Sequence, residues 1–156
     1  EYDVLGPWYK CNMTDIQAAL GLVQLKRYQG MLDRRRELIA LYDSCLAPLG
    51  VEPLPHYADD YASSGHLYIC RVPNISPDQR NEVIEAMAER GVATNVHYKP
   101  LPMMTAYKNL GFDIADYPNA YARFANEITL PLHTCLSDEE ARYVASSFAE
   151  IVEDIR

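Results

Sequence analysis

The sequence lacks the features that define several classes of protein. Its longest stretches without a charged residue, such as 16–25, are ten residues long, about half of what a membrane-spanning helix needs. No basic and apolar leader of the signal-peptide type is visible at residues 1–6. The cysteines show neither CxxC nor CxxH spacing, which argues against a zinc site. We therefore expect a cytoplasmic protein with no membrane partner and no metal site. Its thiols are predicted to be reduced and mostly buried: Cys11, Cys45, Cys70 and Cys135.

Positive charge is also scarce. The chain has 14 Lys and Arg against 22 Asp and Glu, and residues 101–156 hold four basic and nine acidic side chains. Because a nucleic-acid surface needs clustered Lys and Arg, we expect no nucleic-acid partner. The one basic run, Arg34–Arg36, is flanked by Asp33 and Glu37 and is typical of a solvated helix face. A hydrophobic content of 49% over 156 residues favours one globular domain with a real core.

The first predicted element is a long helical arm over about 14–48. Thr14 and Gln17 have the spacing of a capping box, so the helix is expected to begin at Thr14. Apolar residues then recur at helical spacing until Pro48. Gly30 is a plausible bend or break between two helices.

The rest of the chain alternates short strands with helices. The Ser76-Pro77 pair and the glycine at 91 bracket one helix clearly. The pattern predicts an α/β (α+β) fold, with a roughly three-stranded sheet and helices on one face. The predicted elements are a loop over 53–65, strands over 66–72, 92–98 and 128–130, and helices over 77–90, 103–110, 117–126 and 138–152.

Two segments could carry chemistry. Residues 97–102 place an imidazole, a phenol and an ammonium at the abrupt end of a predicted strand, where loops present polar groups to ligands. Lys10 and Asn12 lie just before a helix start and could add donors to an anion site made by free backbone N–H groups. From the residues alone, a plain connecting loop is the favoured alternative for both segments. No phosphate loop, dinucleotide fingerprint or nucleophile elbow is present, and His66 and His133 are interpreted as structural or loop residues.

In this order and spacing the two segments resemble the C-terminal part of the DegT/StrS-type sugar aminotransferases, which are PLP-dependent enzymes of the aspartate aminotransferase class (fold type I). The run from Trp8 to Gly21, with Met13-Thr14-Asp15-Ile16-Gln17 at its centre, is similar to the family pattern. The resemblance extends over essentially the whole chain. Its other segments are 22–27, 34–36, 64–68, 90–92, 96–101 and 130–133.

The resemblance implies transfer of an amino group, usually from glutamate, to a keto group of a nucleotide-linked deoxysugar. Such sugars serve surface polysaccharides or secondary metabolites. In this family a lysine of a large N-terminal domain binds PLP covalently, and no lysine here matches its context: Lys10, Lys26, Lys99 and Lys108. Residues 1–156 are therefore expected to be the small C-terminal domain with its connecting helix. Alone, this piece is expected to be inactive and to contain no catalytic residue.

The resemblance also assigns site residues by position. Lys10 and Asn12 fall where family members reach across a homodimer interface toward the partner's PLP phosphate. His97 and Tyr98 fall where a strand-end loop reaches the partner's sugar-nucleotide pocket. Pro102 stands where many relatives carry His, which leaves the sugar's identity open.

Two alternatives remain. The chain could belong to one of the family's PLP- or PMP-dependent sugar dehydratases, which lack the covalent lysine. It could also be a non-catalytic dimerisation module built on the 14–48 arm, with no cofactor.

Overall fold

The structure is a computed structural model that describes residue 9 and residues 11–156. Its longest element, α1 (Asp15–Leu46), begins where the sequence predicts. The Gln17 N–H donates to the Thr14 hydroxyl over 3.3 Å, and the Thr14 N–H donates to the Gln17 side-chain oxygen over 2.9 Å. The prediction of a break at Gly30 is wrong: α1 is continuous. A mid-helix glycine costs only about 1 kcal/mol relative to alanine, and good helix formers on both sides outweigh that cost.

A three-stranded antiparallel sheet lies beside α1, in the order β1-β4-β5. Its strands are β1 (Glu52–Pro53), β4 (Tyr68–Arg71) and β5 (Glu127–Leu130). A separate hairpin pairs β2 (Tyr57–Ala58) with β3 (Tyr61–Ala62). The predicted loop 53–65 therefore contains part of β1 and the hairpin.

The predicted strand over 92–98 is not a strand. It forms a single antiparallel bridge, in which Asn95 and Thr129 exchange both backbone hydrogen bonds, at 3.2 and 2.7 Å. Beyond it, the His97 N–H donates to the Glu127 side chain instead of to a strand backbone. The backbone pairing ends there because the Glu127 carboxylate, and not a backbone carbonyl, accepts from the His97 N–H.

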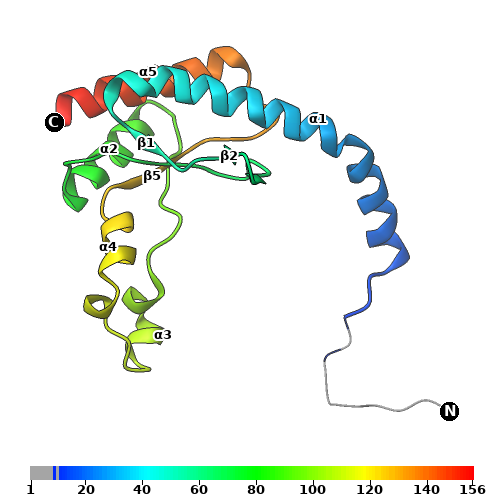
Figure 1. The fold of residues 1–156 in the computed structure, drawn as a ribbon, viewed down its shortest axis with the longest axis horizontal. Coiled ribbons are helices and arrows are strands. Elements are labelled where there is room, and N and C mark those ends of the chain that lie inside the picture. Colours follow the sequence, from blue (N-terminus) through cyan, green and yellow to red (C-terminus); the bar gives the residue numbers. More distant parts are fainter. Residues whose placement is uncertain (1–8, 10) are drawn as a thin grey trace.

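Helices cover one face of the sheet, as predicted (Figure 1). The C-terminal half of α1 packs on α5 (Asp138–Ile155), and α5 packs on α2 (Pro77–Glu89). Side chains alternate along a strand, so Tyr68 and Cys70 enter the core while Ile69 and Arg71 face the other way. The core residues below 1% exposure are Leu38, Tyr42, Tyr68, Cys70, Val72, Val83, Met87, Ile128, Ala141 and Phe148.

A second group of short elements hangs below the sheet in Figure 1. The predicted helix over 103–110 is shorter, a 3-10 turn followed by a helix over Thr105–Lys108, and the predicted helix over 117–126 ends at Phe124. These elements are two 3-10 turns, Leu101–Met103 and Ile114–Asp116, with α3 (Thr105–Lys108) and α4 (Pro118–Phe124). A further 3-10 turn, Ala47–Leu49, ends α1.

The cysteines are free thiols, but their predicted burial is only half right. Cys70 is buried and Cys45 half-buried, whereas Cys11 and Cys135 are exposed. Both exposed cysteines lie in segments that lead into helices, outside the periodic apolar pattern. Within the part of the chain that the structure describes, no helix is long and apolar enough to cross a membrane. The same part holds no group of three or more His, Cys, Asp or Glu that could bind a metal ion.

Gly65 anchors the segment that enters β4. Its φ is +62°, and a Cβ there would lie 3.0 Å from the Ile39 Cδ1 atom and 3.2 Å from the Arg35 Cβ atom of α1. Gly50 has nearly the same φ, +63°, with open space around it. A comparison of alanine substitutions at the two glycines therefore separates the cost of backbone strain from the cost of steric overlap.

We predict that Gly65→Ala destabilises the fold more than Gly50→Ala. Both variants incur the left-handed backbone penalty of about 1–2 kcal/mol, and only Gly65→Ala also forces α1 away from the β4 entry. Urea unfolding of the two variants measures the difference. Equal losses of stability would show that α1 moves away from the new Cβ at no cost in the free energy of unfolding.

His56 is a buried residue directly before the hairpin. Its Nδ1 lies 3.2 Å from the Ser63 Oγ atom, its ring stacks on Tyr68, and its Nε2 is a buried atom without a hydrogen-bond partner among the described residues. Burial lowers the pKa of His56, and the charge of Asp43 opposes that effect in part. The folded chain therefore holds a neutral imidazole in a site that disfavours its protonation.

We predict that this imidazole makes stability fall as pH drops below about 6.5. The unfolded chain protonates His56 at its ordinary pKa, whereas the folded chain does so only at lower pH, so acid favours unfolding. Denaturant midpoints between neutral and mildly acidic pH should fall less for His56→Asn, which cannot titrate. Parallel pH profiles for the two proteins would contradict this assignment.

Candidate functional site

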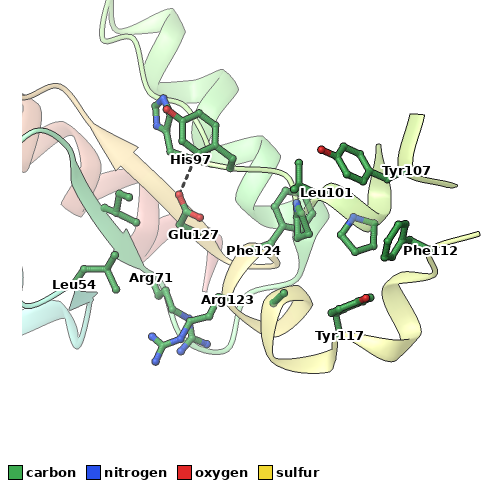
Figure 2. A pocket seen from close by; sticks show the side chains of 15 residues that line it. Leu54, Arg71, His97, Leu101, Tyr107, Phe112, Tyr117, Arg123, Phe124 and Glu127 are labelled. Carbon is green, nitrogen blue, oxygen red and sulfur yellow. Dashed lines mark hydrogen bonds between the residues drawn. The ribbon is translucent and has the colours of Figure 1, made fainter. Parts of the chain in front are cut away.

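The face of the sheet that the helices leave uncovered forms the floor of a cavity of about 800 Å³ (Figure 2). The 3-10 turn Leu101–Met103, α3, α4 and the loop between the two helices form its outer wall. It is lined by Leu54, Ile69, Arg71, His97, Tyr98, Pro100, Leu101, Pro102, Tyr107, Phe112, Tyr117, Ala120, Arg123, Phe124 and Glu127.

The cavity has an aromatic end and a polar end. Tyr107 and Phe112 meet edge to face, with ring centroids 6.1 Å apart, and Tyr117 lies across from them (Figure 2). The polar end lies at the sheet, where Arg71 of β4 stands opposite Glu127 of β5. A mostly apolar cavity of this size with a few polar groups at one end is typical of a small-molecule site.

Arg80 fixes the polar end from behind. This α2 side chain is only 4% exposed, and its Nη1 donates to the backbone oxygens of Phe124 and Glu127 over 3.0 and 3.3 Å. Its guanidinium also lies 4.9 Å from the centre of the Phe124 ring. Burial lowers the pKa of Arg80, with Glu127 opposing that effect. One buried cation thus holds the end of α4 and the start of β5 together.

His97 and Tyr98, the two residues predicted to contact the substrate, both line the cavity. The His97 N–H donates to the Glu127 Oε1 atom over 2.8 Å, and the His97 Nδ1 lies 3.0 Å from the Thr129 hydroxyl. The peptide bond between His97 and Tyr98 is cis, and their rings are perpendicular with centroids 4.7 Å apart. Tyr98 is 70% exposed, so its hydroxyl is accessible to a ligand.

The other predicted pair lies elsewhere. Lys10 is outside the described residues. Asn12 is exposed just before α1, at the end of that helix that extends away from the sheet (Figure 1). Thr14 caps the Gln17 N–H, which leaves earlier first-turn N–H groups free for an acceptor. The Asn12 amide and this helix start fit the needs of a phosphate brought by another chain or domain.

The sequence did not identify Arg71, Arg123 and Glu127 as residues of the cavity. It also did not identify the aromatic end, Tyr107, Phe112 and Tyr117. The signal for Glu127 was present, because an acid directly precedes the buried strand residues 128–130. Arg123 and the aromatic residues carried no comparable signal, since they meet only after the chain has folded back on the sheet.

The fold and the cavity define a small α/β domain with a cavity on its open sheet face. The chain belongs to the DegT/DnrJ/EryC1/StrS aminotransferase family, whose sequence pattern matches residues 2–149. It is 36% identical to the spore coat polysaccharide biosynthesis protein SpsC of Bacillus subtilis over 97% of this chain and 40% of that protein. It is also 36% identical, over 89% of this chain and 34% of the relative, to a dTDP-4-dehydro-2,3,6-trideoxy-D-glucose 4-aminotransferase of Saccharopolyspora spinosa.

Solved structures confirm the predicted fold. Spr1654 of Streptococcus pneumoniae, a protein assigned as a sugar aminotransferase, matches in its PLP form with a TM-score of 0.94 and 55% identity, over 100% of this chain and 40% of that one. PseC of Helicobacter pylori, an aminotransferase of pseudoaminic acid biosynthesis, matches with a TM-score of 0.82 and 29% identity, over 99% and 43%. The chain thus spans about 40% of the length of these relatives.

Proposed function

We propose that this chain is the C-terminal small domain, with its connecting helix, of a PLP-dependent sugar-nucleotide aminotransferase. The observation that carries the proposal is the match of the complete chain, at 55% identity, to Spr1654 in its PLP form. A PMP form of the same protein matches equally well. These are the two cofactor states between which an amino group is carried.

The cofactor would supply the electron sink that amino transfer needs, and the chain's own residues would position it. Lys10 and Asn12 are the candidates for its phosphate. Lys10 lies outside the described residues. Asn12 is exposed beside a helix start, and this position suits a contact across a subunit interface. The covalent lysine is expected on the large domain that the relatives' greater length provides.

The resemblance directs His97 and Tyr98 to the partner's pocket, but both line a cavity of this chain, and the sugar nucleotide would enter that cavity. A mostly apolar pocket with aromatic rings at one end and polar groups at the other suits a ligand that joins a planar base to a hydroxylated ring. The S. spinosa relative is named for a dTDP-linked keto sugar, and SpsC for polysaccharide biosynthesis. An amino acid, usually glutamate, would donate the amino group. A cytoplasmic location is part of the proposal, because exposed free thiols such as Cys11 suit a reducing compartment.

The test uses the full-length protein that contains this chain. We predict that Asn12→Ala weakens PLP binding roughly 10- to 100-fold, because it removes a hydrogen bond to a charged phosphate. Asn109→Ala, at an exposed asparagine after α3, is the matched control and should leave PLP affinity unchanged. Absorbance of bound PLP measures both. Unchanged affinity in Asn12→Ala would reject the phosphate role.

The reaction itself is tested by incubating the PLP-loaded protein with glutamate and a keto sugar nucleotide. Appearance of the amino sugar and 2-oxoglutarate supports the proposal. PLP binding without a covalent lysine, together with dehydration of the sugar, would instead identify a dehydratase. No PLP binding at all would leave a dimerisation module.

A homodimer is the second part of the proposal. The N-terminal half of α1 extends beyond the domain body and carries an apolar stripe: Ile16, Leu20 and Val23 are spaced by four and three residues and are 76%, 65% and 55% exposed. A stripe of this kind on a helix away from the core is typical of a surface that another chain covers.

We predict that the chain self-associates through this stripe and that Leu20→Asp shifts it to monomer, because a charge in an apolar contact must be desolvated. Leu110→Asp is the control, since Leu110 is equally exposed, at 73%, but lies after α3. Sedimentation over a range of concentrations distinguishes the two. A wild-type chain that stays monomeric at high concentration would contradict the prediction.

A further inference from the structure

Glu127 is the buried acid at the polar end of the cavity. It is 6% exposed, stands at the first position of β5 and lines the cavity (Figure 2). Among the described residues no Lys, Arg or His forms an ion pair with its carboxylate. Arg71 bonds to Asn126 and Glu52, and Arg80 reaches only the backbone oxygen of Glu127. Arg123 also lines the cavity but forms no ion pair with Glu127 in the described part of the chain.

The two oxygens of this carboxylate differ. Oε1 accepts from the His97 N–H over 2.8 Å and from the Thr129 hydroxyl over 3.4 Å. Oε2 accepts from no side chain or backbone group that the structure describes. One oxygen therefore anchors the loop that carries His97, and the other is left with its lone pairs unused at the cavity wall.

The Oε2 atom is open to the cavity, because it is not among the fully buried atoms that lack a partner in the described part of the chain. Burial raises the pKa of Glu127, which shows that its surroundings disfavour the charged form even with the His97 and Thr129 bonds in place. A carboxylate that is anchored through one oxygen and open to a cavity through the other presents a fixed acceptor to a ligand that enters the cavity.

We propose that Glu127 is a specificity-determining residue whose Oε2 accepts a hydrogen bond from a hydroxyl or amide N–H on the sugar ring of the substrate. This inference rests on the proposed function, since it takes a sugar nucleotide as the ligand of the cavity. The geometry gives the ligand an orientation: the hydroxylated ring lies at the sheet, and the base lies toward Tyr107, Phe112 and Tyr117. A carboxylate accepts such bonds more strongly than a neutral oxygen would.

Glu127→Gln tests the sugar contact without removing the anchor. The glutamine keeps the length of the side chain, and its amide oxygen can still accept from the His97 N–H. Its NH₂ group then replaces Oε2, so the acceptor offered to the sugar becomes a donor. A Glu127 that only anchors the loop would tolerate this change.

The experiment measures binding by calorimetry to the full-length, PLP-loaded protein. The probes are UDP-N-acetylglucosamine, UDP-glucose and dTDP-glucose, each compared with its free nucleoside diphosphate. We expect the wild type to bind at least one sugar nucleotide more tightly than the free nucleotide. Glu127→Gln should lose roughly 10- to 100-fold of affinity for that sugar nucleotide and none for the free nucleotide. Loss confined to UDP-N-acetylglucosamine would assign the bond to the amide N–H, and loss shared with UDP-glucose to a hydroxyl.

The remaining outcomes separate the two proposals. Full sugar-nucleotide affinity in Glu127→Gln overturns the role of Glu127 and leaves the proposed function standing. Equal losses for sugar nucleotide and free nucleotide also overturn it, because they indicate damage to the whole cavity. Absence of nucleotide binding in the wild type overturns both. Glu153→Gln, an exposed glutamate on α5, controls for the change of charge and should behave as wild type.

Discussion

The pairing of β4 with β5 is the constraint on which the rest of the structure depends. Its register sets Tyr68 opposite Leu130 and Arg71 opposite Glu127, so successive pairs along the strands face opposite sides. One side is sealed by α1, α2 and α5, and the other becomes the polar end of the cavity. A slip of one residue would exchange the two sides, putting charges into the core and core side chains into the cavity.

Buried polar groups cluster where core and cavity meet. Arg80, Asn126, Glu127 and Thr129 are all below 9% exposure, and each has hydrogen-bond partners that come from a different element. Such a cluster adds little to stability compared with apolar packing. Its hydrogen bonds instead fix the end of α4, the start of β5 and the loop at His97 relative to one another. The apolar core holds the domain together, and this polar layer defines its open face.

Local signals in the sequence predicted the helix starts, because each capping box is closed by residues three apart, as at Thr14, Ser76 and Ser137. The sequence did not predict β1 or the hairpin, since two-residue strands exist only through partners distant in the chain. The false strand over 92–98 had suitable residues, but the Glu127 side chain competes for the His97 N–H. Resemblance identified His97 and Tyr98, whereas the cavity joins residues from 54 to 127, which no local pattern relates.

The length of α1 has a mechanical consequence. At 32 residues the helix is about 48 Å long, and only its C-terminal half is held by the core. A tilt of about 5° in the packed half moves the free end, about 24 Å away, by about 2 Å, which is enough to break a hydrogen bond. The tightness with which Leu38, Ile39 and Tyr42 are packed therefore sets the precision with which the segment at Asn12 can meet a group on another chain.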